Sequence, residues 1–244
     1  MQRDLIRKII LEQQTMIANK PIGVIREILK DIQDKIDLNH IIVIKGIRRC
    51  GKSTLLKQIM ETYYKDQGYY YINFDEERFL DFDVKNFDAI HEVLIEQFGN
   101  FKVFFFDEIQ NIKGFEHFVK RLHDNNYKIF ITGSNASLLS GEISSKLTGR
   151  HLDITLYPFS LREFLELKNY RFEKKDIYTT EGRAKFVKWF DEYLLMGGMP
   201  EYIQTSNFEI LPQIYEEILI TDIANRFNIQ NTDNLRRLGQ HLFS

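Results

Sequence analysis

The first two thirds of the chain alternate between short apolar runs and longer amphipathic segments. The apolar runs have the length and composition of β-strands, because they are rich in Ile, Val, Phe and Tyr. Between them, apolar residues recur at helical spacing, and turn residues such as Gly68 and Gly99 separate the elements. This alternation is typical of an α/β fold with a parallel sheet. The five predicted strands are residues 39–45, 69–74, 103–106, 128–133 and 151–156.

Helical segments flank this alternation at both ends. Residues 1–38 predict helices that are broken at Pro21 and Gly23. Apolar residues recur there near helical spacing, including Leu5, Ile9 and Met16. The pattern favours plain amphipathic packing for this region and indicates no chemistry in it.

Beyond Pro158 the strand pattern stops. Apolar residues then recur at helical spacing, and Gly197 and Gly198 end the longest helix of this part. The helices are expected near residues 161–165, 186–194, 207–226 and 232–243. The expected organisation is an N-terminal helical segment (1–38), an α/β core (39–158), a helical domain (159–231) and the start of a truncated further segment (232–244).

A glycine-rich segment follows the first predicted strand and precedes a predicted helix. Residues 46–53 read GIRRCGKS and match the pattern G-x-x-x-x-G-K-[ST]. In that context, backbone N–H groups surround a phosphate, and the helix N-terminus adds its positive dipole end. Lys52 is expected to reach the β- and γ-phosphates, and the Ser53 hydroxyl to bind Mg²⁺. The residues expected to bind the nucleotide are Gly46, Ile47, Arg48, Arg49, Cys50, Gly51, Lys52, Ser53, Thr54 and Ser134.

Two carboxylates end the third predicted strand. Asp107 and Glu108 follow four apolar residues, as expected for a strand that is buried on both faces and ends at the nucleotide site. Asp107 is expected to hold Mg²⁺, and Glu108 to orient the water that attacks the γ-phosphate. Ser134 and Asn135 end the fourth strand, where a polar side chain either touches the γ-phosphate or caps the next helix.

Four other features leave more than one interpretation open. Arg150, before the fifth strand, is either an arginine finger or a structural ion pair. Arg48 and Arg49 either point to solvent or contact the γ-phosphate or a partner subunit. Cys50 is either thiol-sensitive or a small filler residue. The acidic turn at 75–78 either tunes the attacking water, pairs with an arginine, or is simply solvated.

Composition narrows the class of protein. The 244 residues are 43% hydrophobic, which supports a sizeable packed core. Lys+Arg 33 nearly balances Asp+Glu 35, so DNA binding would need a local cluster, and the candidate is Lys45, Arg48, Arg49, Lys52 and Lys57. A single cysteine, no membrane-length apolar run and no signal peptide favour a cytoplasmic protein without a membrane partner.

Taken in order, six motifs resemble one family. They are KGIRRCGKST, FFFDEIQ, FITGSN, LTGR, YPFSLREF and GGMPEY, and they are similar to the AAA+-like (AAA_14-like) ATPases of archaea and bacteria with a DUF4143-type C-terminal domain. The resemblance implies a three-layer P-loop NTPase of the additional-strand (ASCE/AAA+) class. Its five-stranded parallel sheet would have the order 5-1-4-3-2. Residues 159–231 would be a helical lid, and residues 232–244 would begin a truncated winged-helix segment.

The resemblance also implies an activity. ATP and Mg²⁺ would be bound and ATP hydrolysed, which would couple nucleotide state to an effector domain or oligomer. ATP rather than GTP rests on the family, since no Asn-Lys-x-Asp motif is present to read guanine. The alternative is a nucleotide-dependent switch or scaffold with little hydrolysis. Expected partners are ATP, further copies of the chain, and DNA or a protein effector through the missing C-terminal region. The expected catalytic residues are Lys52, Glu108, Asn135 at the sensor position, and Arg150 acting in trans.

Overall fold

The computed structural model describes residues 2–134, 146–147, 149–224 and 227–242. Contacts between Cα atoms divide the chain into two compact units. We call the first the sheet unit, and it comprises Met1–Gly23, Ile28–Gly46 and Lys52–Thr155. The second, the helical unit, comprises Val24–Glu27, Ile47–Gly51 and Leu156–Ser244.

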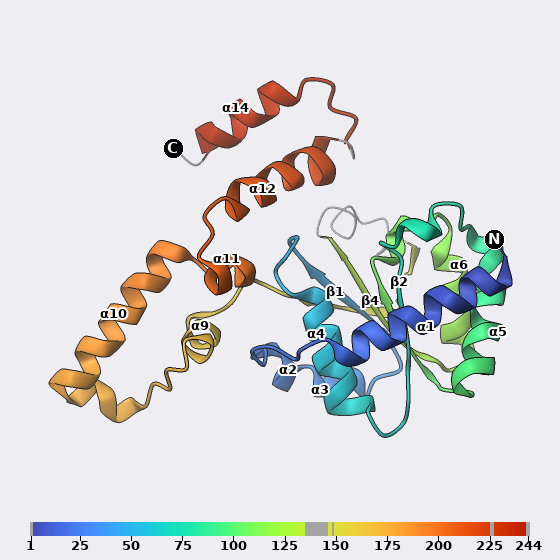
Figure 1. Ribbon diagram of the computed structural model, residues 1–244, viewed down its shortest axis with the longest axis horizontal. Coiled ribbons are helices and arrows are strands. Elements are labelled where there is room, and N and C mark those ends of the chain that lie inside the picture. The colour runs from blue at the N-terminus through green and yellow to red at the C-terminus, as the bar shows by residue number, and fades with distance from the viewer. Residues whose placement is uncertain (1, 135–145, 148, 225–226, 243–244) are drawn as a thin grey trace. The chain divides into compact units, whose positions relative to one another are not determined.

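The sheet unit is built on five parallel strands (Figure 1). They are β1 (Ile41–Gly46), β2 (Tyr70–Asn73), β3 (Val103–Asp107), β4 (Lys128–Ser134) and β5 (His151–Thr155). Their order is β2-β3-β4-β1-β5. This is the predicted order read from the other edge, so the expected fold class and all five strands are confirmed. The strands form here because each apolar run can be buried on both faces.

Three helices precede the first strand: α1 (Arg3–Asn19), α2 (Ile28–Asp31) and α3 (Gln33–Ile36). Three more connect the strands that follow: α4 (Lys52–Ile59), α5 (Phe87–Phe98) and α6 (Phe115–Asp124). One π-helical turn, η1 (Met60–Tyr64), continues α4. Short 3₁₀ turns lie at η2 (Glu77–Phe79), η3 (Val84–Asn86) and η4 (Ile109–Asn111). Phe87 and Phe118 stack between α5 and α6, with ring centroids 4.3 Å apart.

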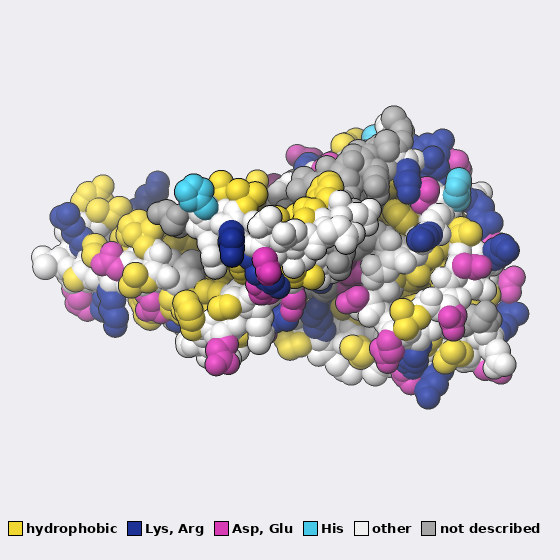
Figure 2. All heavy atoms as spheres, turned by 90° about the horizontal axis from the view of Figure 1, so that it is seen from above, with side chains coloured by type: hydrophobic (Ala, Val, Ile, Leu, Met, Phe, Trp, Pro, Cys, Tyr) yellow, Lys and Arg dark blue, Asp and Glu magenta, His cyan; other side chains and the backbone are white. Residues whose placement is uncertain are grey.

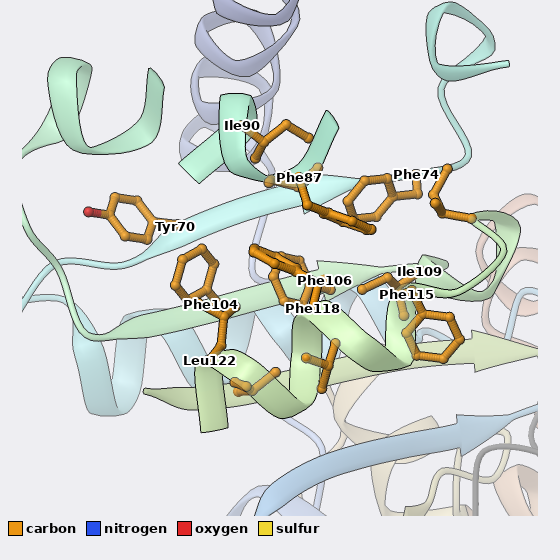
Figure 3. Packing of buried hydrophobic residues seen from close by; sticks show 14 of the residues in the cluster. Tyr70, Phe74, Phe87, Ile90, Phe104, Phe106, Ile109, Phe115, Phe118 and Leu122 are labelled. Carbon is orange, nitrogen blue, oxygen red and sulfur yellow. The ribbon is translucent and has the colours of Figure 1, made fainter. Parts of the chain in front are cut away.

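Alternate side chains of β3 point to opposite faces of the sheet, as the pleat requires. Phe104 and Phe106 join the aromatic cluster under α5 and α6 (Figure 3). Phe105 faces the other way and stacks on Phe130 of β4, with ring centroids 4.6 Å apart. Tyr64 at the end of η1 contacts both of these rings edge-on. Helices therefore cover both faces, which gives the three-layer arrangement.

Helix α1 covers the free edge of strand β2. The Gln13 side chain exchanges two hydrogen bonds of 2.9 Å with the backbone N–H and C=O of Asn73. Gln14 donates a third, of 3.3 Å, to the carbonyl of Tyr71. An uncovered edge strand leaves backbone groups without partners, and α1 supplies them. The buried face comprises Ile6, Ile9, Ile10, Gln13 and Ile17, whereas the expected Leu5 and Met16 are exposed.

The helical unit contains five α-helices among its described residues. They are α9 (Leu161–Leu167), α10 (Thr180–Met196), α11 (Pro200–Thr205), α12 (Ile210–Glu217) and α14 (Thr232–Leu242). A 3₁₀ segment, η5 (Lys174–Tyr178), precedes α10, and the π-helical η6 (Ile218–Ala224) continues α12. The pattern of the sequence did not predict α11. Within the described part of the chain, no helix has both the length and the apolar character to cross a membrane.

A buried ion pair lies at the centre of the helical unit. The guanidinium of Arg26 donates a 3.0 Å hydrogen bond to Glu163, and both side chains are at most 5% exposed. The Glu163 carboxylate also accepts the backbone N–H groups of Glu27 and Ser160, at 2.8 and 2.9 Å. The second bond completes the capping box that begins α9. Both carboxylate oxygens of Glu163 therefore accept hydrogen bonds, two at Oε1 and one at Oε2.

We expect Glu163→Gln to destabilise the helical unit by about 3–5 kcal/mol, because it leaves the Arg26 charge buried without its counter-ion. The single tryptophan, Trp189, packs against the core of the same unit, so its fluorescence during urea unfolding reports on that unit. Glu166→Gln on the same helix is the control, since Glu166 is exposed. Equal unfolding midpoints for the two variants would show that the Arg26–Glu163 ion pair does not stabilise the helical unit.

Candidate phosphate-binding site

The loop 47–51 joins the end of β1 to the start of α4. Gly51 has φ +102°, a region that side chains rarely adopt, and a Cβ there would lie 3.1 Å from a guanidinium nitrogen of Arg26. Arg26 also donates a 2.7 Å hydrogen bond to the carbonyl of Cys50. The Arg26 side chain therefore fixes the loop backbone at Cys50. Its closeness and the positive φ angle require glycine at position 51.

Lys52 lies at the start of α4 and points back along the loop. Its side chain is 6% exposed, and its Nζ donates to the carbonyl of Gly46, at 3.2 Å. The same Nζ lies 3.9 Å from Oε1 of Glu108. The structure thus brings together the expected phosphate-binding lysine and the expected water-orienting carboxylate. Ser53 and Thr54 follow Lys52 in the first turn of α4.

The carboxylate of Asp107 is 98% buried and held by two hydroxyl groups. The Thr132 hydroxyl donates to Oδ1, and the Tyr71 hydroxyl donates to Oδ2 at 3.1 Å. Thr132 also accepts the backbone N–H of Glu108, at 3.2 Å. Sequence reasoning missed both hydroxyl residues because they lie inside apolar strands. The signal available was a lone Thr in the fourth apolar run, at the end that faces the site.

Glu108 has a left-handed backbone, with φ 52°. Non-glycine residues rarely adopt this conformation, and those that do cluster at functional sites. Burial raises the pKa of the Glu108 carboxyl above its ordinary value, and the charge of Asp107 adds to this effect. Lys52 and a hydrogen bond from Gln110 oppose the rise. A carboxylate with a raised pKa is a better proton acceptor near neutral pH.

Ser53 and Asp107 fit a magnesium ion. Both line one cavity of about 540 Å³ in the sheet unit. Mg²⁺ is usually held by one or two protein oxygens, with waters and substrate phosphates completing its shell. Among the described residues, no group of three or more His, Cys, Asp or Glu forms a metal site by itself. A hydroxyl and one carboxylate at this cavity match the sparse protein contribution that Mg²⁺ requires.

Of the two residues expected at the sensor position, Ser134 and Asn135, the structure describes the backbone of the first only. The backbone of Ser134 lies beside Gly46, because these residues are partners in the β1–β4 pairing. Asn135 lies outside the described residues. The role proposed for either side chain therefore stays a prediction.

The two loop arginines contact carboxylates within the helical unit. Nε of Arg48 lies 3.0 Å from Asp222 of η6. Arg49 bridges two helices, at 3.2 Å from Glu201 of α11 and 2.9 Å from Glu217 of α12. Neither arginine simply points to solvent. The interpretation that they contact a triphosphate or a partner subunit stays a prediction.

Cys50 is fully buried in the helical unit, with its Sγ 3.6 Å from the carbonyl of Leu156. This environment suits a small filler residue. Reactive cysteines are usually partly exposed, so the burial does not favour thiol sensitivity.

Arg150 lies at the amino edge of the sheet. It precedes His151, which pairs with Ile41 at the first residue of β1, whereas Gly46 ends that strand. Its guanidinium lies 3.4 Å from Asp124, at the end of α6. Arg150 is therefore in an ion pair at the edge opposite its own phosphate loop. A role in trans, on another copy of the chain, stays a prediction.

The acidic turn after β2 contains an internal ion pair. Nε of Arg78 lies 2.6 Å from Glu76, and Nη1 lies 2.7 Å from Glu12 of α1. Pairing with an arginine was one of the three interpretations of this turn, and the structure favours it.

A double-mutant cycle tests whether Thr132 positions Asp107. We expect Thr132→Val and Asp107→Asn to be non-additive by about 1–2 kcal/mol in the free energy of unfolding, because the two side chains share one buried hydrogen bond. Urea unfolding followed by circular dichroism measures the four free energies. Thr15→Val with Asp107→Asn is the control pair, since Thr15 is exposed and its hydroxyl donates to the Leu11 carbonyl of the same helix. Additive free energies for Thr132 and Asp107 would show that the hydroxyl does not hold the carboxylate.

The chain is similar in sequence to proteins of archaea and bacteria. A protein of Methanocaldococcus jannaschii, named only as uncharacterized, is 35% identical over 245 residues, which cover 98% of this chain and 55% of that protein. An uncharacterized protein of Haemophilus influenzae is 34% identical over 213 residues, covering 82% of this chain and 50% of that protein. The chain thus spans about half the length of these relatives.

Among solved structures, the Hsp104:casein complex of S. cerevisiae is similar with a TM-score of 0.51. The match is 17% identical and covers 75% of this chain and 36% of that chain, so it supports the fold alone. The model of a family described as an AAA domain matches residues 38–165, more than half of the chain. That match spans the glycine loop, the acidic pair and all five strands, and the chain therefore belongs to the AAA domain family.

Proposed function

We propose that this protein binds ATP with Mg²⁺ and hydrolyses it. The observation that carries the proposal is the meeting of Lys52, Asp107 and Glu108 at the carboxyl edge of the sheet, beside the glycine loop. A buried lysine and two adjacent carboxylates form a costly cluster, and a bound triphosphate with its metal ion gives each of them a partner.

Each residue has a separate task in the proposed reaction. The loop N–H groups and the Lys52 ammonium bind the β- and γ-phosphates, which draws Lys52 away from Glu108. Ser53 and Asp107 would hold Mg²⁺, which would neutralise charge on the phosphates. Glu108 orients a water molecule and accepts its proton as the oxygen attacks the γ-phosphorus. The bond from the γ-phosphorus to the bridging oxygen breaks, and ADP leaves with the electron pair.

We expect Glu108→Gln to retain ATP binding and to lower kcat by about 10²–10⁴-fold, because the amide cannot accept the proton of the attacking water. Steady-state phosphate release and the binding of a fluorescent ATP analogue measure the two quantities. Glu77→Gln is the matched control, since Glu77 is exposed on η2. A Glu108→Gln variant with unchanged kcat would refute the role of the carboxylate.

A second function, a switch with little hydrolysis of its own, is favoured by the position of Arg150. Transition-state charge on phosphate is commonly stabilised by an arginine that a neighbour supplies. Arg150 is remote from the loop of its own chain, so only a second copy could present it there. On this proposal the chain binds ATP and hydrolyses it slowly or not at all, because no arginine of its own reaches the loop. Its nucleotide state would be read by a protein effector.

The dependence of the ATPase rate on protein concentration separates the two functions. If Arg150 acts in trans, the rate per chain rises steeply with concentration, and Arg150→Ala lowers the high-concentration rate by about 10³-fold or more. Arg171→Ala, at an exposed arginine of the helical unit, is the control. A flat rate near zero supports the switch. An Arg150→Ala rate that still rises to the wild-type level excludes the finger.

We do not extend the proposal to DNA. The cations considered for DNA binding have carboxylate partners, as for Lys45 with Asp153 and Lys57 with Glu61, both at 2.6 Å. On the face seen in Figure 2, described side chains of both signs are interspersed. A nucleic-acid backbone would need a continuous basic surface. The ion pairs neutralise the basic cluster that the sequence offered for this role, so the cluster does not support DNA binding.

A further inference from the structure

The end of helix α1 is anchored between two elements of the proposed site. On one side, Gln13 and Gln14 hold the backbone of β2. On the other, Nζ of Lys57 in α4 donates to the carbonyl of Ala18, at 3.1 Å. The segment that follows is held as well, because Gln58 of α4 donates to the carbonyl of Ile22, at 2.9 Å. The position of the residues between Ala18 and Ile22 is therefore determined from both sides.

Lys20 lies in this anchored segment and lines the cavity that Ser53 and Asp107 also line. All three residues belong to the sheet unit. Among the described residues, the Lys20 ammonium forms no hydrogen bond and no ion pair. Burial lowers the pKa of Lys20, and the charge of Asp107 opposes that effect, as expected for groups within electrostatic reach of one another. The cavity thus has a hydroxyl, a carboxylate and an ammonium group around it.

Three charges meet at this cavity when the site is loaded. Mg²⁺ held by Ser53 and Asp107 would repel the Lys20 ammonium, and the one carboxylate cannot neutralise both cations. The anion that the proposed function brings to this place is the terminal phosphate, which has oxygens free to accept hydrogen bonds from an ammonium group. A γ-phosphate would therefore satisfy Lys20, whereas ADP would leave it without a partner.

We propose that Lys20 is a γ-phosphate-binding residue, supplied by the N-terminal helix, that lets the protein distinguish a nucleoside triphosphate from a diphosphate. The proposal rests on the proposed nucleotide site and deepens it. It gives α1 a part in recognition besides its packing on β2. Lys52 binds the phosphates from the start of α4, and Lys20 binds the terminal one from the cavity that Ser53 and Asp107 also line.

The test compares the affinities for ATP and ADP. With fluorescent ribose-labelled ATP and ADP and Mg²⁺ in excess, we expect Lys20→Met to weaken ATP binding by about tenfold or more, the loss of one charge-assisted hydrogen bond. ADP binding should change less than about twofold, because ADP lacks the group that Lys20 contacts. Lys20→Arg should restore most of the difference, since a guanidinium also donates to phosphate.

The control is Lys8→Met, the same change at a lysine of α1 that is 69% exposed, and it should alter neither affinity. Thermal unfolding without nucleotide should be the same for the wild type and Lys20→Met. Equal losses of ATP and ADP affinity, or an unchanged ratio of the two, would overturn the role of Lys20. If the wild type binds neither nucleotide, the proposed function itself fails, so the two failures are distinguishable.

Discussion

The register of the parallel sheet is the constraint on which the site depends. Pairing Gly46 with Ser134, and Phe106 with Ile131, brings the ends of β1, β3 and β4 to one edge. That alignment lets the Thr132 hydroxyl reach Asp107 and support the backbone of Glu108. A slip of one residue would turn these polar side chains to the other face of the sheet. It would also exchange the faces on which the aromatic side chains of β3 pack. The alternating phenylalanines of β3 therefore stabilise the geometry of the carboxylates as well as the core.

The N-terminal helix α1 supplies hydrogen-bond partners to the edge strand of the sheet. Strand β2 is at the edge, and its outer backbone groups need partners that the sheet cannot supply. Two glutamine side chains of α1 supply them, while the isoleucines of α1 enter the aromatic core. The packing of α1 on β2 also fixes the position of the residues that follow the helix. For this reason Lys20, which follows α1, lines the same cavity as Ser53.

The phosphate loop is subject to two kinds of restraint. Its ends continue into β1 and α4, whereas its central residues 47–51 have their contacts in the helical unit. The ion pairs of Arg49 are partly exposed, and such pairs are individually worth about 0–1 kcal/mol. The Arg26–Glu163 pair is buried, and Arg26 also donates to the carbonyl of Cys50 in the loop. The loop backbone is therefore held through a buried ion pair, whereas the Arg49 side chain is held by pairs that are individually weak.

The sequence by itself determined the fold class, because apolar runs and breakers are local signals and a parallel sheet follows from their alternation. It also predicted Gly46–Thr54 and Asp107–Glu108 as candidate site residues, since a glycine-rich loop and strand-end carboxylates are contiguous patterns. Only the tertiary structure decided which other residues join them. Tyr71, Thr132 and Lys20 come from three different elements, and no spacing along the chain relates them. The buried face of α1 was likewise undetermined, because a face with Leu5 and Met16 and a face with Ile6, Ile10 and Ile17 both fit helical spacing around Ile9. The structure buries the second, on the side where Gln13 and Gln14 bond to β2.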